Sequence, residues 1–132
     1  MFHVMDISAS GLVAQRIRMN TIAMNIANVD TVAGPDGGPY KRRSVIFETG
    51  MAGKGRGGQG VRVSEIRKEA LYRLEYDPNH PYANKDGYVK LPGINHLVEM
   101  VNGMEASRAY EANLAALEFS KTMITSSLRL LA

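Results

Sequence analysis

Cysteine is absent from this 132-residue chain, and long apolar runs are absent too. Without cysteine the chain has no disulfide, no thiolate metal site and no cysteine nucleophile. This absence leaves the cellular compartment open, because cysteine-free chains occur in both redox settings. No run approaches the roughly 18 apolar residues of a spanning helix. The first residues also lack the basic and apolar segments of a secretory signal, so we expect neither a membrane span nor a cleaved signal peptide.

Excess charge is also scarce, since the formal net charge is only +3. Residues 30–90 carry eleven basic and eight acidic side chains, and residues 91–132 carry three basic and four acidic ones. An excess this small does not require a nucleic-acid partner. A nucleic-acid-binding module that uses the basic middle of the chain is still one alternative, and salt-sensitive affinity would favour it.

The basic residues of the middle segment do not form one patch. Lys41, Arg42 and Arg43 lie in a strand-like stretch, with Lys54 and Arg56 further along. On a strand, Lys41 and Arg43 share a face while Arg42 points to the other side. We therefore expect a solvated face, or a polar contact with a partner subunit, and no nucleic-acid site.

Residues 5–29 are predicted to form the first of two long helices. Asp6 is a plausible N-cap, and the segment 28–31 followed by Gly34 and Pro35 ends the pattern. The 3-4 spacing is typical of a coiled-coil seam. The seam comprises Met5, Ser8, Leu12, Gln15, Met19, Ile22, Ile26 and Val29.

Residues 92–132 are predicted to form the second helix. Pro92 fits a first turn and Asn95 could cap it, and no proline follows. This helix is apolar on more than one side, which indicates more than one neighbour. Its main predicted seam comprises Met100, Gly103, Ser107, Tyr110, Leu114, Leu117, Lys121, Ile124, Leu128 and Leu131.

The segment between the helices is predicted to be β-rich. Strand propensity and alternation occur over residues 40–48, 61–64, 71–76 and 88–91. A glycine-rich stretch, 50–60, is expected to be a flexible loop, and residues 77–87 an irregular, turn-rich segment.

These elements predict an α+β fold in three parts. We expect a coiled-coil helix over residues 1–29, a small β-rich domain over 30–91 and a coiled-coil helix over 92–132. The middle part, of about 60 residues, is near the lower limit at which a domain is stable alone. Since the helices have more apolar surface than this part can cover, we expect neighbouring subunits to cover the rest.

No motif in the chain indicates chemistry. Residues 55–60 match G-x-G-x-x-G, but a strand-like segment follows instead of the helix that a dinucleotide site requires. His3, His80 and His96 have no helical spacing and no acidic cluster beside them. We therefore expect no enzyme, no catalytic residue, no cofactor and no metal.

Polar and small residues inside the helices suggest close packing. Asn25 and Asn113 lie beside the seams, and a buried amide can fix the register of a bundle at a cost in stability. Gly11 and Gly103 each cost about 1 kcal/mol relative to alanine in a helix. Close approach of two helices would justify that cost.

Several motifs resemble those of bacterial flagellar axial proteins, the superfamily of rod and hook subunits. The N-terminal motif, residues 10–16 and 22–28, is shared across the superfamily. The others resemble the proximal rod proteins of the basal body more specifically and stand in the same order over the whole chain: PYKRR at 39–43, YDPNHP at 76–81, GYVKLP at 87–92, EMV at 99–101 and RAYEAN at 108–113. Gly93 and Glu69 depart from that family's pattern.

The resemblance implies a structural subunit that polymerises helically with itself and with other rod proteins. Its terminal helices would form an inner layer around the central export channel, and its β-rich middle an outer layer. Further implied partners are the type III export apparatus, the rod cap and the adaptor that links the rod to the export gate and membrane ring. The rod would act as a torque-transmitting drive shaft in the periplasm.

Helix packing would then be the mechanism, and the helix seams would supply the subunit interface. A helical-hairpin adaptor confined to the cytosol is the other alternative. The predicted interface residues are Leu12, Gln15, Met19, Ile22, Asn25, Ile26, Asn28, Met100, Tyr110, Asn113, Leu114, Leu117, Ile124 and Leu128.

Overall fold

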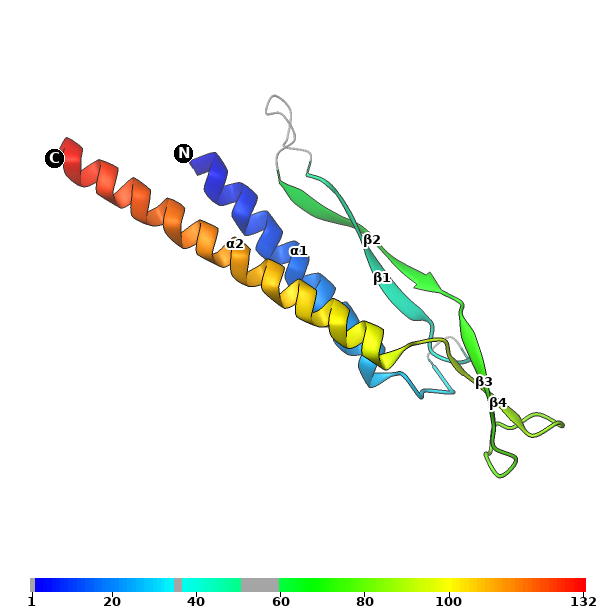
Figure 1. Ribbon diagram of the computed structural model, residues 1–132. Helices are drawn as coiled ribbons and strands as arrows, with labels where there is room; N and C mark the ends of the chain where they lie inside the picture. Colours follow the sequence, from blue (N-terminus) through cyan, green and yellow to red (C-terminus); the bar gives the residue numbers. More distant parts are fainter. Residues whose placement is uncertain (1, 35–36, 51–59) are drawn as a thin grey trace.

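The computed structural model describes residues 2–34, 37–50 and 60–132. Figure 1 shows an elongated molecule in which two long helices lie side by side and two narrow β ribbons follow one another along and beyond them. In chain order the elements are α1 (Phe2–Ala27), β1 (Arg42–Thr49), β2 (Val61–Glu69), β3 (Tyr72–Tyr76), β4 (Tyr88–Pro92) and α2 (His96–Leu131).

The two helices run antiparallel and approach closely at small residues. A Cβ at Gly11 would lie 2.8 Å from the Asn113 amide nitrogen, and one at Gly103 would lie 3.5 Å from Ile22. The close approach predicted from the two glycines is therefore confirmed. With 36 residues against 26, α2 continues past the beginning of α1, as Figure 1 shows.

The starts of the helices differ in part from the predictions. Asn95 caps α2 as predicted, because its side chain accepts hydrogen bonds from the backbone N–H groups of Leu97 and Val98. Pro92 is instead the last residue of β4, where it needs no backbone donor. The prediction that Asp6 caps α1 is wrong, since α1 begins at Phe2 and Asp6 lies inside the helix.

The antiparallel hairpin β1–β2 lies against α1 and is tied to it at both ends. Near its tip, the Val61 N–H donates to the Ser10 hydroxyl at 3.1 Å. Near its base, the Asn25 side chain bonds to both backbone groups of Arg43. The Gly50 N–H donates to the Gly60 carbonyl across the strand ends. Most of the predicted 50–60 loop, residues 51–59, lies outside the described residues.

The second ribbon, β3–β4, lies beyond the C-terminal end of α1 (Figure 1). Its two faces differ, because Val89 and Leu91 are buried whereas Leu74 and Tyr76 are exposed. At its base the Gly93 N–H donates to the Leu71 carbonyl at 2.7 Å. A Cβ at position 93 would lie 2.9 Å from the Leu71 backbone, so glycine permits this contact.

The α+β class with two long terminal helices is thus confirmed, and all four strand segments are present. β2 is longer than predicted, reaching Glu69, and a bulge interrupts its pairing with β1. The predicted turn-rich segment is confirmed in the turns between β3 and β4. The buried apolar set of the described residues is small: Ala14, Ile22, Tyr40, Val89, Leu91, Ile94 and Ala106.

Enlarging Gly11 should weaken the helix pair. We expect Gly11→Val to destabilise the chain by about 2 kcal/mol, because valine cannot fit against the Asn113 side chain without a shift. Urea unfolding of the purified chain, followed by far-ultraviolet circular dichroism, measures this change. Adding Asn113→Ala should recover most of the loss, and equal destabilisation with and without it would show that the contact is unimportant.

Candidate functional site

A buried asparagine joins α1 to the two other elements that meet at its C-terminal end. Asn25 is fully buried. Its amide nitrogen donates to the Arg43 carbonyl at 2.7 Å and to Glu99 Oε2 at 3.2 Å. Its oxygen accepts from the Tyr40 hydroxyl at 3.1 Å and from the Arg43 N–H at 2.9 Å. Both donors and both acceptor positions of the amide are therefore used.

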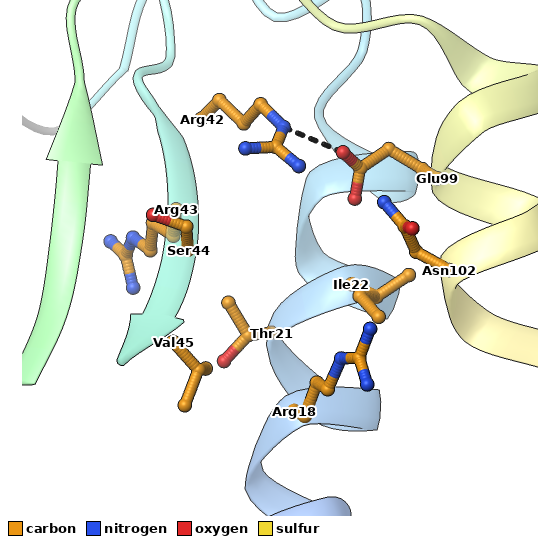
Figure 2. Close-up of a pocket in the computed structure, with 9 residues that line it drawn as sticks. All are labelled: Arg18, Thr21, Ile22, Arg42, Arg43, Ser44, Val45, Glu99 and Asn102. Carbon is orange, nitrogen blue, oxygen red and sulfur yellow. Dashed lines mark hydrogen bonds and ion pairs between the residues drawn. The ribbon is translucent and has the colours of Figure 1, made fainter. Parts of the chain in front are cut away.

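A buried carboxylate on α2 continues this network into the sheet. Glu99 is 1% exposed, and its Oε1 accepts from Arg42 Nε at 2.6 Å. Figure 2 shows Arg42 reaching from β1 across to Glu99 on α2. Arg42 also bonds to Glu69 at 3.0 Å, and Glu69 accepts from the Ser44 hydroxyl at 3.0 Å. The ion pairs thus link α2, β1 and β2.

The surroundings shift the pKa of two groups in the network. Burial raises the pKa of the Tyr40 hydroxyl; Arg43 works against this rise and Glu99 adds to it. Burial disfavours the Arg42 cation, but hydrogen bonds and charge from Glu99 and Glu69 outweigh that effect, so the pKa of Arg42 is raised. Tyr40 therefore stays a neutral donor and Arg42 a cation at physiological pH.

A pocket of about 170 Å³ opens between α1, β1 and α2 beside this network (Figure 2). Its charged lining residues are Arg18, Arg42, Arg43 and Glu99. Arg42 is paired with Glu99, and Arg18 forms an ion pair with Glu105 at 3.5 Å. Arg18, Arg42 and Glu99 thus have charged partners within the chain, whereas the buried Nε of Arg43 has no hydrogen-bond partner among the described residues.

The predicted interface residues of α1 face the rest of the chain to different degrees. Ile22 and Asn25 are buried. Leu12, Gln15 and Met19 are partly exposed, as are Ile26 and Asn28. A buried oxygen of Gln15 has no hydrogen-bond partner among the described residues.

The residues of the predicted α2 seam are not all covered by the rest of the chain. Tyr110, Leu117 and Ile124 are half-buried as a seam requires, and so is Asn113. Met100, Leu114 and Leu128 are exposed. The more buried positions next to them are polar or small, namely Glu99, Asn113 and Ser127. The part that all of these residues play in a subunit interface stays a prediction.

On α2, residues 105–113 carry the exposed charges of Glu105, Arg108 and Glu111. Before and after this segment, many long apolar side chains are exposed. They are Leu97, Val98, Met100, Val101, Met104, Leu114, Phe119, Met123, Leu128, Leu130 and Leu131. Exposed apolar side chains gathered in this way are typical of a protein-interaction site.

The sequence interpretation missed Glu99, Arg42 and Tyr40. It expected Arg42 on a solvated face or at a polar contact with a partner subunit, and the structure instead pairs Arg42 with Glu99 and Glu69 of the same chain. The available clue was Glu99 itself, the one acidic residue in the first turn of α2, directly after Leu97 and Val98. Its partner is 57 residues away in sequence, so no local spacing could have identified it.

No group of metal-binding side chains exists in the parts of the chain that the structure describes. Among the same residues, no helix is both long enough and apolar enough to cross a membrane. The described site therefore offers hydrogen bonds, ion pairs and apolar surface for packing.

The sequences of both helices match models of known protein families. Residues 5–35 match the family model "Flagella basal body rod protein", and residues 85–130 match "Flagellar basal body rod FlgEFG protein C-terminal". The matched segments include most of α1 and most of α2. They identify the class as flagellar basal-body rod proteins.

Individual relatives narrow the class further. The chain is 43% identical over 131 residues to flagellar basal-body rod protein FlgC of Salmonella typhimurium, with 98% of this chain and 97% of the relative covered. It is 43% identical over 154 residues to FlgC of Borreliella burgdorferi (99% and 97% covered). It is 37% identical over 145 residues to FlgC of Bacillus subtilis (98% and 97% covered). The chain belongs to the FlgC family of rod proteins, a structural family and not a class of enzymes.

The substitution Asn25→Asp tests the buried hydrogen-bond network of Asn25 and Glu99. The change removes both amide donors and places a second carboxylate beside Glu99. We expect a loss of about 3 kcal/mol in the free energy of unfolding, measured in urea.

Asn20→Asp is the matched control, since Asn20 lies on the exposed side of the same helix. It should change the free energy of unfolding by less than about 0.5 kcal/mol. Equal losses for the two variants would contradict a special role for the buried amide.

Proposed function

We propose that this chain is a structural subunit of the proximal rod of the flagellar basal body. Copies of it polymerise helically with one another and with other rod proteins, and the polymer encloses the export channel and transmits torque. The observation that supports this most strongly is the match to FlgC over nearly the whole of both chains. The many exposed apolar side chains of α2 support it independently, because a free monomer gains nothing from such a surface.

In this proposal the helices form the inner layer of the rod and the β ribbons the outer one. Residues 1–29 and 92–132 pack as coiled coils with the helices of neighbouring subunits, and residues 30–91 cover them. The antiparallel helix pair supports the division, since it leaves many apolar side chains of α2 exposed for neighbouring subunits. The hydrophobic contacts of the inner layer are then made mainly between subunits.

The interface that we propose combines two groups of residues. Leu12, Met19 and Ile26, which the chain itself covers only in part, meet neighbours on the α1 side. Met100, Leu114 and Leu128 meet them on the outer side of α2. Tyr110, Leu117 and Ile124 are half-buried in the single chain. In the proposal they pack against α1 and also contact neighbouring subunits.

The remaining partners follow from the same proposal. The chain passes through the flagellar type III export apparatus and is placed in the rod beneath a rod cap, in the periplasm. At the base it meets the adaptor that connects the rod to the export gate and the membrane ring. The family to which the chain belongs supports these partners.

Deleting the gene for this chain tests the proposal directly. Electron microscopy of detergent-extracted basal bodies should then show membrane rings without a rod or hook. Re-expression of the wild-type chain should restore both. Complete rods and hooks in the deletion strain would contradict the proposed function.

Introducing a charge at Leu117 tests the packing mechanism. We expect Leu117→Asp to abolish rod assembly while export continues, because it places a carboxylate in a half-buried apolar position of every subunit. Motility and the amount of exported chain are the measurements.

Glu118→Asp places the same residue one position along, on the exposed side of α2. It should leave motility intact, which separates packing from the low helix propensity of aspartate. A motile strain carrying Leu117→Asp would contradict the packing mechanism.

A further inference from the structure

The β1–β2 hairpin consists of two parts that a bulge separates. The pairing of the strands shifts between Ile46 and Phe47, so Ser64 on β2 has no partner residue on β1. A bulge of this kind bends the strand and increases its local twist. We call the part beyond the bulge, residues 47–50 and 60–63, the hairpin arm.

The two parts of the hairpin are attached to α1 in different ways. Before the bulge, both backbone groups of Arg43 bond to the side chain of the fully buried Asn25. In the hairpin arm, residues 47–49 are exposed. Among the described residues, a single hydrogen bond joins the arm to α1, from the Val61 N–H to the Ser10 hydroxyl. The arm therefore depends on one polar contact, whereas the rest of the hairpin is held by a buried network.

The helix itself orients the hydroxyl of Ser10. The hydroxyl donates to the Ile7 carbonyl at 2.7 Å and accepts from the Val61 N–H at 3.1 Å. A serine hydroxyl has one proton to donate. Because that proton is used on Ile7, the lone pairs of the oxygen are left for Val61. The arm thus meets an acceptor whose direction α1 fixes.

Gly60 allows the arm to come close enough for this bond. Its φ is +95°, which residues with a side chain rarely adopt, and a Cβ there would lie 2.5 Å from the Ser10 oxygen. A side chain at position 60 would therefore displace the hydroxyl from Val61. Serine at position 10 and glycine at position 60 fit one another, although they lie far apart in the sequence.

Ser10 and its neighbour Gly11 position α1 against two different elements. Gly11 lies against Asn113 of α2, and Ser10 bonds to the hairpin arm. Both residues lie in the segment that matches the rod-protein family model. Two consecutive residues of this segment thus contact the helix layer and the β layer separately.

We propose that Ser10 is the positioning residue of the hairpin arm, and that without its hydroxyl the arm turns about the bulge. Val61 and Val63 are half-buried and also contribute to the contact. Apolar contact has no preferred direction, so the hydrogen bond sets the angle of the arm. One such bond changes the ratio of attached to detached arms by about two- to twelvefold. This role belongs to the single chain, so its test does not depend on the proposed function.

Spin labels on the purified full-length chain measure the position of the arm. The chain has no cysteine of its own, so labels are attached through Thr49→Cys on the arm and Glu111→Cys on α2, both exposed positions. Pulsed electron spin resonance then gives the distribution of distances between the labels. We expect a narrow distribution, which Ser10→Ala widens by about twofold or more. Arg67→Cys with Glu111→Cys reports on the hairpin before the bulge and should keep its width.

Two serine variants show whether the hydroxyl itself is responsible. Ser10→Thr keeps the hydroxyl and should keep the narrow distribution. Ser120→Ala removes a hydroxyl that bonds to the Ala116 carbonyl of its own helix and does not contact the arm, so it should change nothing. An unchanged width in Ser10→Ala, equal widening in Ser120→Ala, or a broad distribution before any change at Ser10 would each overturn the proposal.

The glycine on the arm tests the same contact from the other side. Gly60→Ala should widen the distribution as Ser10→Ala does, and the two changes together should widen it no further. Gly37→Ala is the matched control, because Gly37 has a similar φ of +81° and nothing within 4 Å of its Cβ position. It should keep the narrow distribution, which separates the contact from backbone strain. A narrow distribution in Gly60→Ala would overturn the proposal.

Discussion

The hydrogen bonds of the Asn25 amide are the constraint on which the rest of the fold depends. This one buried group contacts α1's own partner helix through Glu99 and the start of β1 through Arg43. A buried amide or carboxylate without partners costs about 1–3 kcal/mol or more. The helix pair and the hairpin base are therefore stable only in the register that satisfies both side chains. Shifting either helix by one residue would leave Glu99 and Asn25 unpaired together.

This polar junction accompanies an unusual distribution of apolar residues. Between α1 and α2, small residues approach polar and apolar ones, such as Gly11 against Asn113 and Gly103 against Ile22. Many methionine, leucine and phenylalanine side chains of α2 are exposed. The chain thus uses hydrogen bonds at this junction and leaves much of its hydrophobic surface exposed. In the proposed polymer, neighbouring subunits would cover that surface and add stability.

The spacing of apolar residues along the sequence predicted the helices and strands well, because it reflects which side of each element is buried. Both helices, all four strand segments and the Asn95 cap were accessible in this way. Met100, Leu114 and Leu128, which were predicted to lie in a subunit interface, are exposed in the single chain. Their part in such an interface stays a prediction. Asp6 lost its predicted capping role because α1 starts earlier. The pairing of Arg42 with Glu99 joins residues 57 positions apart, and only the folded arrangement brings them together.

The β1–β2 hairpin is fastened to α1 at two separate points, Ser10 and Asn25. Fifteen residues of helix separate them, a span of about 22 Å. A ribbon held at a single point would swing under a sideways load and peel away one bond at a time. Held at both ends, it can yield only by shear, with the ties and the intervening contacts loaded together. A twisting force on α1 is therefore carried to the hairpin through two attachments that are loaded together.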